Sequence, residues 1–518
     1  MTGSRTEAKG LPARDADLRD HLAFGDAIIT CRKLASPYRM PPLSTVRALL
    51  RLGRVDRLDE LGAAGPLHAA TTADTPADAD PELRKFEAVF ARDALLVIEF
   101  IGNIFPRLRR TTVYALAQVQ GVEYDAAREE EPGKIVHEWR DSTDPVAQEI
   151  TAQRGWGWPY YGAVDTTPLF IRTTVALLEA DPAAGAAQVK QRDGRRCMLV
   201  DSLISAIGWL CRRMDDDPDG LLTYRRINPR GIENQIWRDS WDSLSHADGG
   251  LVNHDRPVAA LDVQALAYDA LVAAARHLRT RSAEETRAAG ALDERAQRVR
   301  NAVLERFWIE DGGIGFFAGA LDFSPTGARR PLRTRISDMG HLLKSGVLHG
   351  KNIHEYRDAV VRQLFSPGLL CAAGIRSLDA GEVRYWPGGY HTGNSWLWQS
   401  MHIADGLEQY GFAQLAEELR NRCHRVHLRT GLLPEFARGN DEIGVLNDRI
   451  VDVWQAADQR ENRLEQPPQE VQAWTVASLY AAKRRTKEKV RPLPPPTRLE
   501  QDILEELPDR PDNFRTPA

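Results

Sequence analysis

The sequence has few of the features that mark secreted, membrane-spanning or nucleic-acid-binding proteins. Five cysteines are scattered over 518 residues without a CxxC pair, which predicts reduced thiols in a reducing compartment. No run of about 18 apolar residues could span a membrane, and the polar start has no apolar segment typical of a secretory signal. Lysine and arginine (68) nearly balance aspartate and glutamate (73), so the net charge of −5 argues against a polyanion-binding surface. We expect a cytoplasmic protein that binds neither membranes nor nucleic acids; its oligomeric state is left open.

Sequence motifs of several common enzyme classes are also missing. There is no GxxxxGK[ST], GxGxxG, HExxH or GxSxG, so phosphate-loop, dinucleotide, zinc-protease and nucleophile-elbow chemistry has no support. The acidic run 215–220 imitates the start of an EF-hand loop, but Arg226 stands at the twelfth position, where a bidentate Glu is needed. The sequence therefore predicts no metal and no cofactor.

Helical periodicity dominates between two polar ends. Residues 261–278 are the clearest example, with apolar side chains every three or four positions. Long segments rich in Trp, Gly, Asp and His interrupt the helices, and such irregular connections usually carry function. We predict a polar segment at 1–35, one all-helical domain at 36–484, and a tail at 485–518 whose proline and charge do not favour order.

Tryptophan is as frequent as tyrosine, with twelve each. Most of the tryptophans lie in or beside the irregular segments, close to Asp, Glu, Arg and His. Tryptophan usually fills a core, and several of these are expected to do so. The pattern also fits a sugar pocket, because an indole packs on the C–H face of a sugar ring while polar groups bind its hydroxyls. Two carboxyl groups then hydrolyse the glycosidic bond, one protonating the leaving oxygen and one activating water or attacking carbon.

Eight motifs occur in an order that resembles one enzyme family. They are FARDAL at 90–95, EPGKIVHEWR at 131–140, YYGAVDTTPLF at 160–170, NQIWRDSWDSLSHADG at 234–249, AGIRSLD at 373–379, YHTGNSWLWQS at 390–400, LLPEF at 432–436 and QAWTVASLY at 472–480. Together they resemble the amylo-α-1,6-glucosidase (glycogen-debranching) family of inverting glycosidases, which is related to glucoamylase and glucosylglycerate hydrolase. The resemblance covers most of residues 86–484. It implies an all-α fold, the (α/α)6 barrel or six-hairpin toroid, with long loops at one end forming the active site.

The resemblance also implies the catalytic residues. Asp239 in NQIWRD would be the general acid and Glu435 in LLPEF the general base. In an inverting enzyme these carboxyl groups stand roughly 6.5–9.5 Å apart, which leaves room for a water molecule. Asp242 is an alternative acid, because on a helix it would share a face with Asp239. Asp441 and Glu442 are alternatives to the base with less support from the motifs.

Further residues match the family's sugar-binding positions. The resemblance implies that Arg92 and Asp93 grip the O4 and O6 hydroxyls of the terminal sugar and that Asp165 binds another hydroxyl. Expected pocket-wall groups are His137, Glu138 and His391, and expected platforms for the sugar ring are Trp237, Trp241 and Trp396. Plainer alternatives are a surface ion pair for Arg92 and Asp93, a structural role for His391, and core positions for the tryptophans.

Two departures from the family pattern bear on the substrate. Only about 85 residues precede FARDAL, and they predict helix or disorder rather than the family's β-rich domain, which favours a short oligosaccharide or a glucosylated small molecule over a polymer. The expected Trp-Pro-(Trp/His)-Asp run ends in Gln399 instead of Asp. We predict an exo-acting inverting α-glycosidase, with an α-glucosidase favoured. The alternatives are an enzyme for trehalose, a glucosylglycerate-like solute or a rhamnoside, and a non-catalytic carbohydrate-binding protein.

Overall fold

A computed structural model describes most of the chain between residues 42 and 507. The described ranges are 42–62, 65–71, 86–279, 282–350, 353–443, 451–456, 459–464, 468–488 and 493–507. The predicted segment at 1–35 lies outside them. Helices dominate the described ranges and strands are short, in agreement with the predicted helical class. None of the described helices is long and apolar enough to cross a membrane.

The elements follow in chain order. The α-helices are α3 (Pro42–Gly53), α4 (Ala91–Ile101), α5 (Pro106–Gln118), α6 (Pro145–Arg154), α7 (Thr166–Ala180), α8 (Leu199–Asp215), α9 (Leu261–Leu278), α10 (Ala283–Ala302), α11 (His354–Leu364), α12 (Leu397–Gln409), α13 (Ala413–Thr430), α14 (Ala473–Glu488) and α15 (Arg498–Glu506). The short helical turns are η2 (Pro182–Ala186), η3 (Val303–Phe307), η4 (Ser337–Leu343) and η5 (Gly346–Leu348).

The strands form small antiparallel sheets. The pairs are β1 (Ala70–Thr71) with β17 (Val471–Gln472), β2 (Val89–Phe90) with β3 (Glu138–Trp139), β4 (Gln188–Lys190) with β5 (Arg196–Met198), β7 (Trp308–Asp311) with β8 (Ile314–Phe317), β11 (Leu370–Cys371) with β12 (Gly374–Ile375), β13 (Ser395–Trp396) with β14 (Phe436–Ala437), and β15 (Val451–Ala456) with β16 (Gln459–Leu464). A three-stranded sheet has β9 (Ala320–Phe323) between β6 (Ala259–Ala260) and β10 (Arg329–Pro331).

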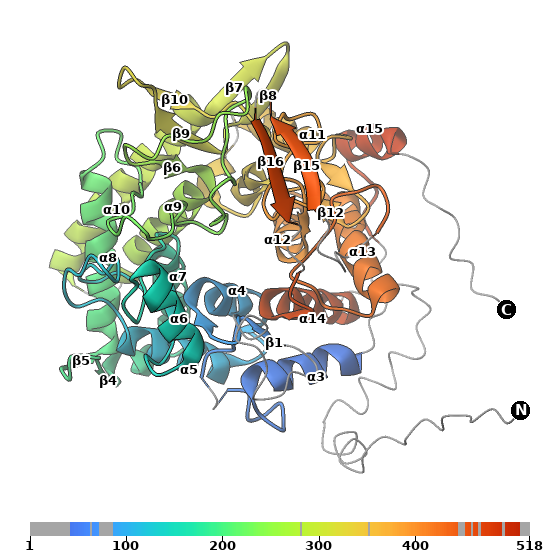
Figure 1. The fold of residues 1–518 in the computed structure, drawn as a ribbon. Helices are drawn as coiled ribbons and strands as arrows, with labels where there is room; N and C mark the ends of the chain where they lie inside the picture. The colour runs from blue at the N-terminus through green and yellow to red at the C-terminus, as the bar shows by residue number, and fades with distance from the viewer. Residues whose placement is uncertain are drawn as a thin grey trace, which may run out of the picture.

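Six helical elements pack against one another in a closed ring (Figure 1). α4 contacts α7, α7 contacts α9, α9 contacts η4, η4 contacts α12, α12 contacts α14, and α14 returns to α4. A second set, α3, α5, α8, α10, α11 and α13, packs on these six and alternates with them along the chain. The described residues therefore form two layers of helices that share one hydrophobic core.

Sequence pattern separates the two layers. Every residue of the inner helix α4 except Glu99 is buried, and its sequence ARDALLVIEFI is apolar on most sides. Helix α10 in the outer layer buries one face, at Ala289, Leu292, Ala296, Val299 and Ala302, and is charged elsewhere. A helix that is apolar nearly all round is typical of the interior of a fold, whereas a narrow apolar stripe is typical of a helix with one solvent-exposed side.

The inner elements begin directly after short strands or loops that carry the predicted site residues. β2 runs into α4, β6 into α9, β13 into α12 and β17 into α14. Arg92 and Asp93 lie in the first turn of α4, and Asp165 is the residue before α7. Unpaired backbone N–H groups make a helix N-terminus favourable for carboxylates. The fold thus collects acidic side chains at the N-terminal end of the inner ring.

The C-terminal region differs from the predicted disordered tail. α14 extends to Glu488, and α15 forms within it. α15 starts with a capping box between Thr497 and Glu500 and buries Ile503. One carboxylate oxygen of Glu500 also accepts from the backbone N–H groups of Gln414 and Leu415, at 2.8 and 3.3 Å. The sequence expectation was wrong here because it weighed proline and charge but not this cap, which docks α15 against the start of α13.

Candidate active site

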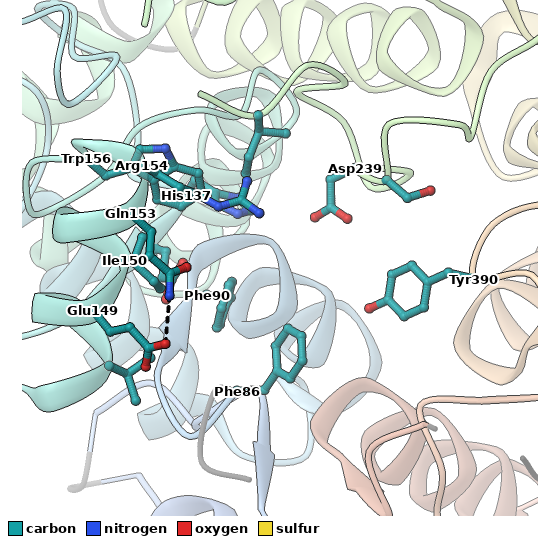
Figure 2. A pocket seen from close by; sticks show the side chains of 14 residues that line it. Phe86, Phe90, His137, Glu149, Ile150, Gln153, Arg154, Trp156, Asp239 and Tyr390 are labelled. Atoms are coloured by element: carbon teal, nitrogen blue, oxygen red, sulfur yellow. Dashed lines mark hydrogen bonds between the residues drawn. The ribbon is translucent and has the colours of Figure 1, made fainter. Parts of the chain in front are cut away.

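A cavity of about 290 Å³ opens beside the start of α4 (Figure 2). Its lining comes from separate parts of the chain, namely Phe86, Phe90, His137, Glu138, Val146, Glu149, Ile150, Gln153, Arg154, Trp156, Ile232, Asp239, Ser240 and Tyr390. Figure 2 shows the carboxylate of Asp239 and the hydroxyl of Tyr390 pointing into the same space. The cavity therefore has carboxylates, a cation and aromatic rings on its wall, which suits a small polar ligand.

Arg92 connects two of the predicted carboxylates. Its Nε donates to Asp165 Oδ2 at 2.5 Å and its Nη2 to Asp165 Oδ1 at 3.2 Å. Its Nη1 lies 3.6 Å from Asp239 Oδ2. Burial opposes the charge of Arg92, but Asp165 and Asp239 outweigh it and raise the Arg92 pKa. The side chain of Asp239 keeps 32% exposure, so its carboxyl group is accessible from the cavity while Arg92 holds one side of it.

Asp93 is buried and accepts a hydrogen bond from Gln472 Nε2 at 2.8 Å. Burial raises the pKa of Asp93 to about 8; the negative charges of Glu435 and Asp239 add to this effect, and Arg92 opposes it. At neutral pH this carboxyl is largely protonated and can donate as well as accept. Asp93 does not itself line the cavity, although its chain neighbour Arg92 lies 3.6 Å from the cavity residue Asp239.

Glu435 lies directly before β14 and is buried. Tyr390 donates its hydroxyl to Glu435 Oε1 at 2.5 Å, and the backbone N–H of Gln469 donates to Oε2 at 3.3 Å. Burial raises the pKa of Tyr390 well above its usual range, with a further contribution from the charges of Glu435 and Asp239. Tyr390 therefore stays a neutral donor, and it links Glu435 to the cavity that Asp239 lines.

The alternative carboxylates lie elsewhere. Asp242 is buried and accepts from Ser240 Oγ at 2.9 Å, and it does not line the cavity. The segment around Asp239 is irregular rather than helical, so the two residues do not share a helix face. Asp441 is 94% exposed and pairs with Arg376 at 3.0 Å, and Glu442 is exposed.

The three predicted tryptophan platforms do not line this cavity. Trp237 and Trp396 are buried, with their indole N–H groups donating to Asp338 Oδ1 at 3.1 Å and to the Tyr390 carbonyl at 3.0 Å. Trp241 is 48% exposed, and the Arg384 guanidinium lies 5.8 Å from its ring. Hydrogen bonds to buried partners hold the indoles of Trp237 and Trp396 in the core. The aromatic wall is instead made by Phe86, Phe90, Trp156 and Tyr390.

The predicted polar wall is only partly present. His137 and Glu138 line the cavity, and Glu138 is paired with Arg140. The His137 ring sits edge-on to Phe90, and burial lowers its pKa well below the usual value. His391 is buried behind this wall, stacked on Trp396 with 4.9 Å between ring centroids, and its Nδ1 lies 2.9 Å from Ser240 Oγ. These contacts favour a supporting role for His391.

Sequence reasoning missed one whole wall, which comes from α6. Val146, Glu149, Ile150, Gln153 and Arg154 all line the cavity. Their spacing of three and four places them on one helix face, a signal that was present in the sequence but belonged to no motif. Asp144 caps this helix by accepting from two backbone N–H groups, and Gly155, at φ +64°, ends it.

Arg154 is the cation of this wall. Its guanidinium lies 5.6 Å from the ring centroid of Trp156. Among the described residues it has no carboxylate within ion-pair distance. An arginine held over an indole and facing a cavity can bind a ligand carboxylate in a bidentate manner.

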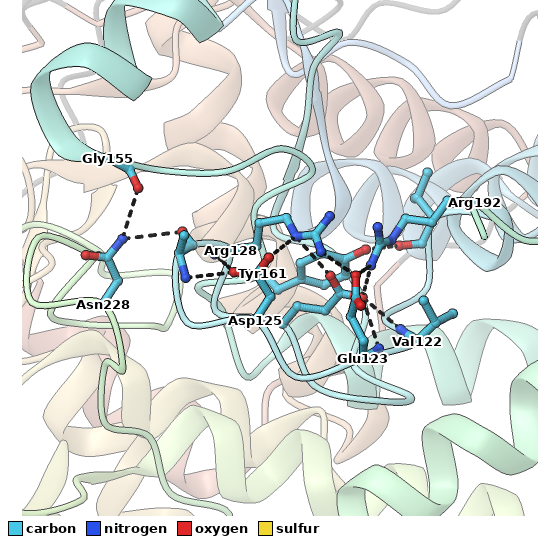
Figure 3. A network of polar contacts seen from close by, with 11 residues as sticks. Val122, Glu123, Asp125, Arg128, Gly155, Tyr161, Arg192 and Asn228 are labelled. Atoms are coloured by element: carbon cyan, nitrogen blue, oxygen red, sulfur yellow. Dashed lines mark hydrogen bonds and ion pairs between the residues drawn. The ribbon is translucent and has the colours of Figure 1, made fainter.

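A polar network behind the cavity fixes the segment that leads to Asp239 (Figure 3). Glu129 is fully buried at φ +57°, and its Oε1 accepts from the backbone N–H groups of Ile227 and Asn228, both at 2.7 Å. Asn228 in turn donates to the carbonyl oxygens of Ala127 and Gly155. The network thereby ties Ala127 and Glu129 to residues 227–228, and through Asn228 to Gly155 at the end of α6.

Within the described ranges, no group of three or more His, Cys, Asp or Glu side chains could hold a metal ion.

The chain matches a family model described as the mannosylglycerate hydrolase MGH1-like glycoside hydrolase domain over residues 166–437. It also shares the fold of GH63 mannosylglycerate hydrolase from Thermus thermophilus. The crystal structure of that enzyme with Tris and D-glycerate has a TM-score of 0.53 and 16% identity, covering 86% of this chain and 100% of that one. The complex with Tris alone has a TM-score of 0.52 and 14% identity over the same shares. Curated proteins give no match.

Proposed function

Because this chain belongs to the mannosylglycerate hydrolase MGH1-like family of glycoside hydrolases, we propose that it hydrolyses a small α-glycoside by an exo-acting, inverting mechanism. The enzyme class follows from the family. The sequence motifs favour glucose as the sugar, and the match to a mannosylglycerate hydrolase type adds mannose as the alternative. The two layers of helices support the (α/α)6 barrel, and we propose residues 36–484 as its extent.

Asp239 is the proposed general acid and Glu435 the proposed general base. The observation that most supports this pair is their connection through Tyr390, which lines the same cavity as Asp239 and donates its hydroxyl to Glu435. Asp239 would protonate the glycosidic oxygen as the bond from that oxygen to the anomeric carbon breaks. Glu435 would take a proton from the water that attacks the opposite face of the sugar, so that the freed sugar has inverted configuration.

Arg92, Asp93 and Asp165 are the proposed sugar-binding group. The positive charge of Arg92 compensates the negative charges of Asp165 and Asp239. Asp93, which is protonated at neutral pH, is the proposed donor to a sugar hydroxyl. A protonated carboxyl group can donate to one sugar hydroxyl through its O–H and accept through its other oxygen.

A small hydroxy acid is the proposed leaving group. Thermus thermophilus mannosylglycerate hydrolase was crystallised with D-glycerate. In the present chain Arg154 offers a guanidinium on the cavity wall without an ion-pair partner among the described residues. A carboxylate on the leaving group could pair with this exposed guanidinium, whereas a neutral glucan offers it no opposite charge. We therefore favour an α-glucosyl or α-mannosyl glycerate over a polysaccharide.

The test is turnover of α-glucosyl glycerate, α-mannosyl glycerate, trehalose, isomaltose and an aryl α-rhamnoside, with the first-formed anomer followed by NMR. We expect a glycerate glycoside to be the best substrate and the β-anomer to appear first. Asp239→Asn and Glu435→Gln should each lower kcat by about 10²–10⁴-fold. Asp242→Asn serves as the matched control and should retain most activity. An active Asp239→Asn variant would remove that residue from the mechanism, and first release of the α-anomer would rule out inversion.

The role of Arg154 is tested by comparing KM values for a charged and a neutral substrate. Arg154→Ala should raise KM for the glycerate glycoside about tenfold or more, in line with a lost charged hydrogen bond, and leave KM for a neutral 4-nitrophenyl α-glycoside nearly unchanged. Arg107→Ala, at an exposed arginine of α5, is the control and should change neither value. Equal KM changes for both substrates would contradict the proposed leaving group.

A further inference from the structure

We propose that Arg238, which precedes Asp239, is a positioning residue that sets the spacing between the general acid and the general base. The proposal rests on the proposed function. Arg238 does not line the cavity described above: its side chain is wholly buried, as is that of its partner Asp338 at the start of η4.

The Arg238 guanidinium has four acceptors. Nε donates to Asp338 Oδ2 at 2.7 Å and Nη1 to the His391 carbonyl at 2.9 Å. Nη2 donates to Ser337 Oγ at 2.8 Å and to the Ser377 carbonyl at 2.6 Å. The guanidinium also stacks on the indole of Trp237, 4.7 Å from its centroid. An arginine fork with this many fixed acceptors has a single position, and so does the backbone beside it.

Arg238 is connected to both sides of the proposed reaction centre. On one side, Arg238 is bonded covalently to Asp239. On the other, its contact with the His391 carbonyl reaches the residue after Tyr390, whose hydroxyl binds Glu435. Two hydrogen bonds and the intervening covalent bonds therefore connect the proposed acid to the proposed base through Arg238. The pairing of Trp396 with Phe436 in β13 and β14 holds the base side of this connection.

Gln399 explains why this arrangement tolerates the loss of the expected aspartate. Its Nε2 donates to Asp338 Oδ1 at 3.0 Å, and its Oε1 accepts from Ser337 Oγ at 2.7 Å. An aspartate at position 399 would bring a second carboxylate against Asp338, and like charges at that distance repel strongly in a buried site. The amide instead satisfies Asp338 and Ser337, and so keeps both aimed at Arg238.

Misplacing the acid should matter most for leaving groups that need a proton. A glycerate alkoxide is a poor leaving group and depends on the general acid, whereas fluoride leaves with little protonation. Asp338→Asn keeps the side-chain shape but leaves the buried charge of Arg238 uncompensated. We expect kcat on the glycerate glycoside to fall about 100-fold, the effect of a misplacement of roughly 1 Å. The loss on the α-glycosyl fluoride of the same sugar should be at least tenfold smaller.

The control is a buried arginine–aspartate pair away from the cavity. Arg329 donates to both oxygens of Asp217 at 2.9 and 2.8 Å, and both side chains are buried. Asp217→Asn should lower the melting temperature by a smaller amount, because Asp219 also pairs with Arg329 at 2.8 Å, and should change kcat on both substrates by the same small factor. Equal losses of Asp338→Asn on the glycoside and the fluoride would overturn the proposal, since a smaller folded fraction affects both substrates alike.

A second variant covers the case in which Asp338→Asn does not fold. Ser337→Ala removes a neutral acceptor of Arg238 and should show the same unequal loss, about tenfold on the glycoside; equal losses again overturn the proposal. Asp239→Asn in the same assay separates the two ideas. If it is inactive while both network variants behave as wild type, only the positioning role fails. If Asp239→Asn is fully active, the proposed function itself fails.

Discussion

A single carboxyl group, that of Asp93, shows how strongly the ring of helices changes side-chain chemistry. It is buried at the start of α4 with Gln472 as its hydrogen-bond partner, and its pKa is raised to about 8. In an unfolded chain an aspartate titrates near 3.9. The folded protein therefore binds this proton more tightly than the unfolded chain does, and the difference acts between about pH 4 and pH 8.

Asp93 should make the protein less stable as pH rises. Stability increases with pH only where the unfolded chain binds more protons, and here the folded state binds more, so the contribution of Asp93 is full below pH 4 and lost by about pH 8. Asp93→Asn removes this dependence. Relative to wild type, the variant should gain on the order of 2–4 kcal/mol in unfolding free energy between pH 5 and pH 8, measured by urea denaturation. Asp441→Asn, at a 94% exposed site, should follow wild type. Parallel curves for wild type and Asp93→Asn would contradict the assignment.

At the scale of elements, loops rather than helices place the reacting groups. Glu129, in a left-handed backbone conformation, holds the segment at Ile227 and Asn228 through two backbone N–H groups. That conformation costs a non-glycine residue roughly 1–2 kcal/mol, so the contacts that it permits must offset the cost. The segment continues to Asp239, which makes Glu129 part of the support for the site.

Glu129→Ala should destabilise the protein by about 2–4 kcal/mol, because two buried N–H groups lose their acceptor while the backbone strain remains. Glu129→Gln keeps an acceptor oxygen and should cost less. Glu123→Ala provides the control in the same loop, since that side chain is 58% exposed, and should cost less than about 1 kcal/mol. Urea unfolding of the three variants measures their losses in unfolding free energy and so ranks them. A loss for Glu129→Ala no larger than that of Glu123→Ala would show that the network does not hold the loop.

At the scale of the whole molecule, the ring closes between distant parts of the sequence. α14 packs against α4, and Gln472 reaches Asp93 across 379 positions. α15 adds to the outer layer, because Glu500 caps the start of α13 and Asp502 lies 3.4 Å from Arg362 of α11. The C-terminal helix thus joins two outer helices at the edge of Figure 1, away from the cavity.

Removing the Glu500 side chain should lower the stability of the protein without changing its activity. Glu500→Ala loses an acceptor shared by two N–H groups of α13 and one of Thr497, so we expect a loss of about 1–3 kcal/mol in unfolding free energy. Glu505→Ala, on the exposed side of the same helix, should cost less than about 0.5 kcal/mol. Thermal melting gives the difference, and kcat at 25 °C should stay at the wild-type value for both variants. A large fall in kcat would show that α15 supports the site.

What could be predicted from the sequence depended on how local each signal is. Helical periodicity is local, and the helical class is confirmed. Of the residues that the motifs indicated, Asp239 lines the cavity, Arg92 lies 3.6 Å from Asp239, and Glu435 accepts from the cavity residue Tyr390; their catalytic roles stay predictions. The tryptophans could not be assigned, because the direction of an indole depends on partners such as Asp338, 101 positions from Trp237. The wall from α6 belonged to no motif, and only the fold shows what its face meets.

The limited packing of α6 against other elements has a consequence for engineering the leaving-group preference of this enzyme. Among the described elements it packs extensively against no other helix or strand; its own cap at Asp144, the turn at Gly155 and the Trp158 indole bond to the Ala147 carbonyl hold it in place. A ten-residue helix held in this way can be replaced without changing the packing of the inner and outer helices. Grafting foreign helices between Asp144 and Gly155 is therefore a direct route to altered leaving-group choice.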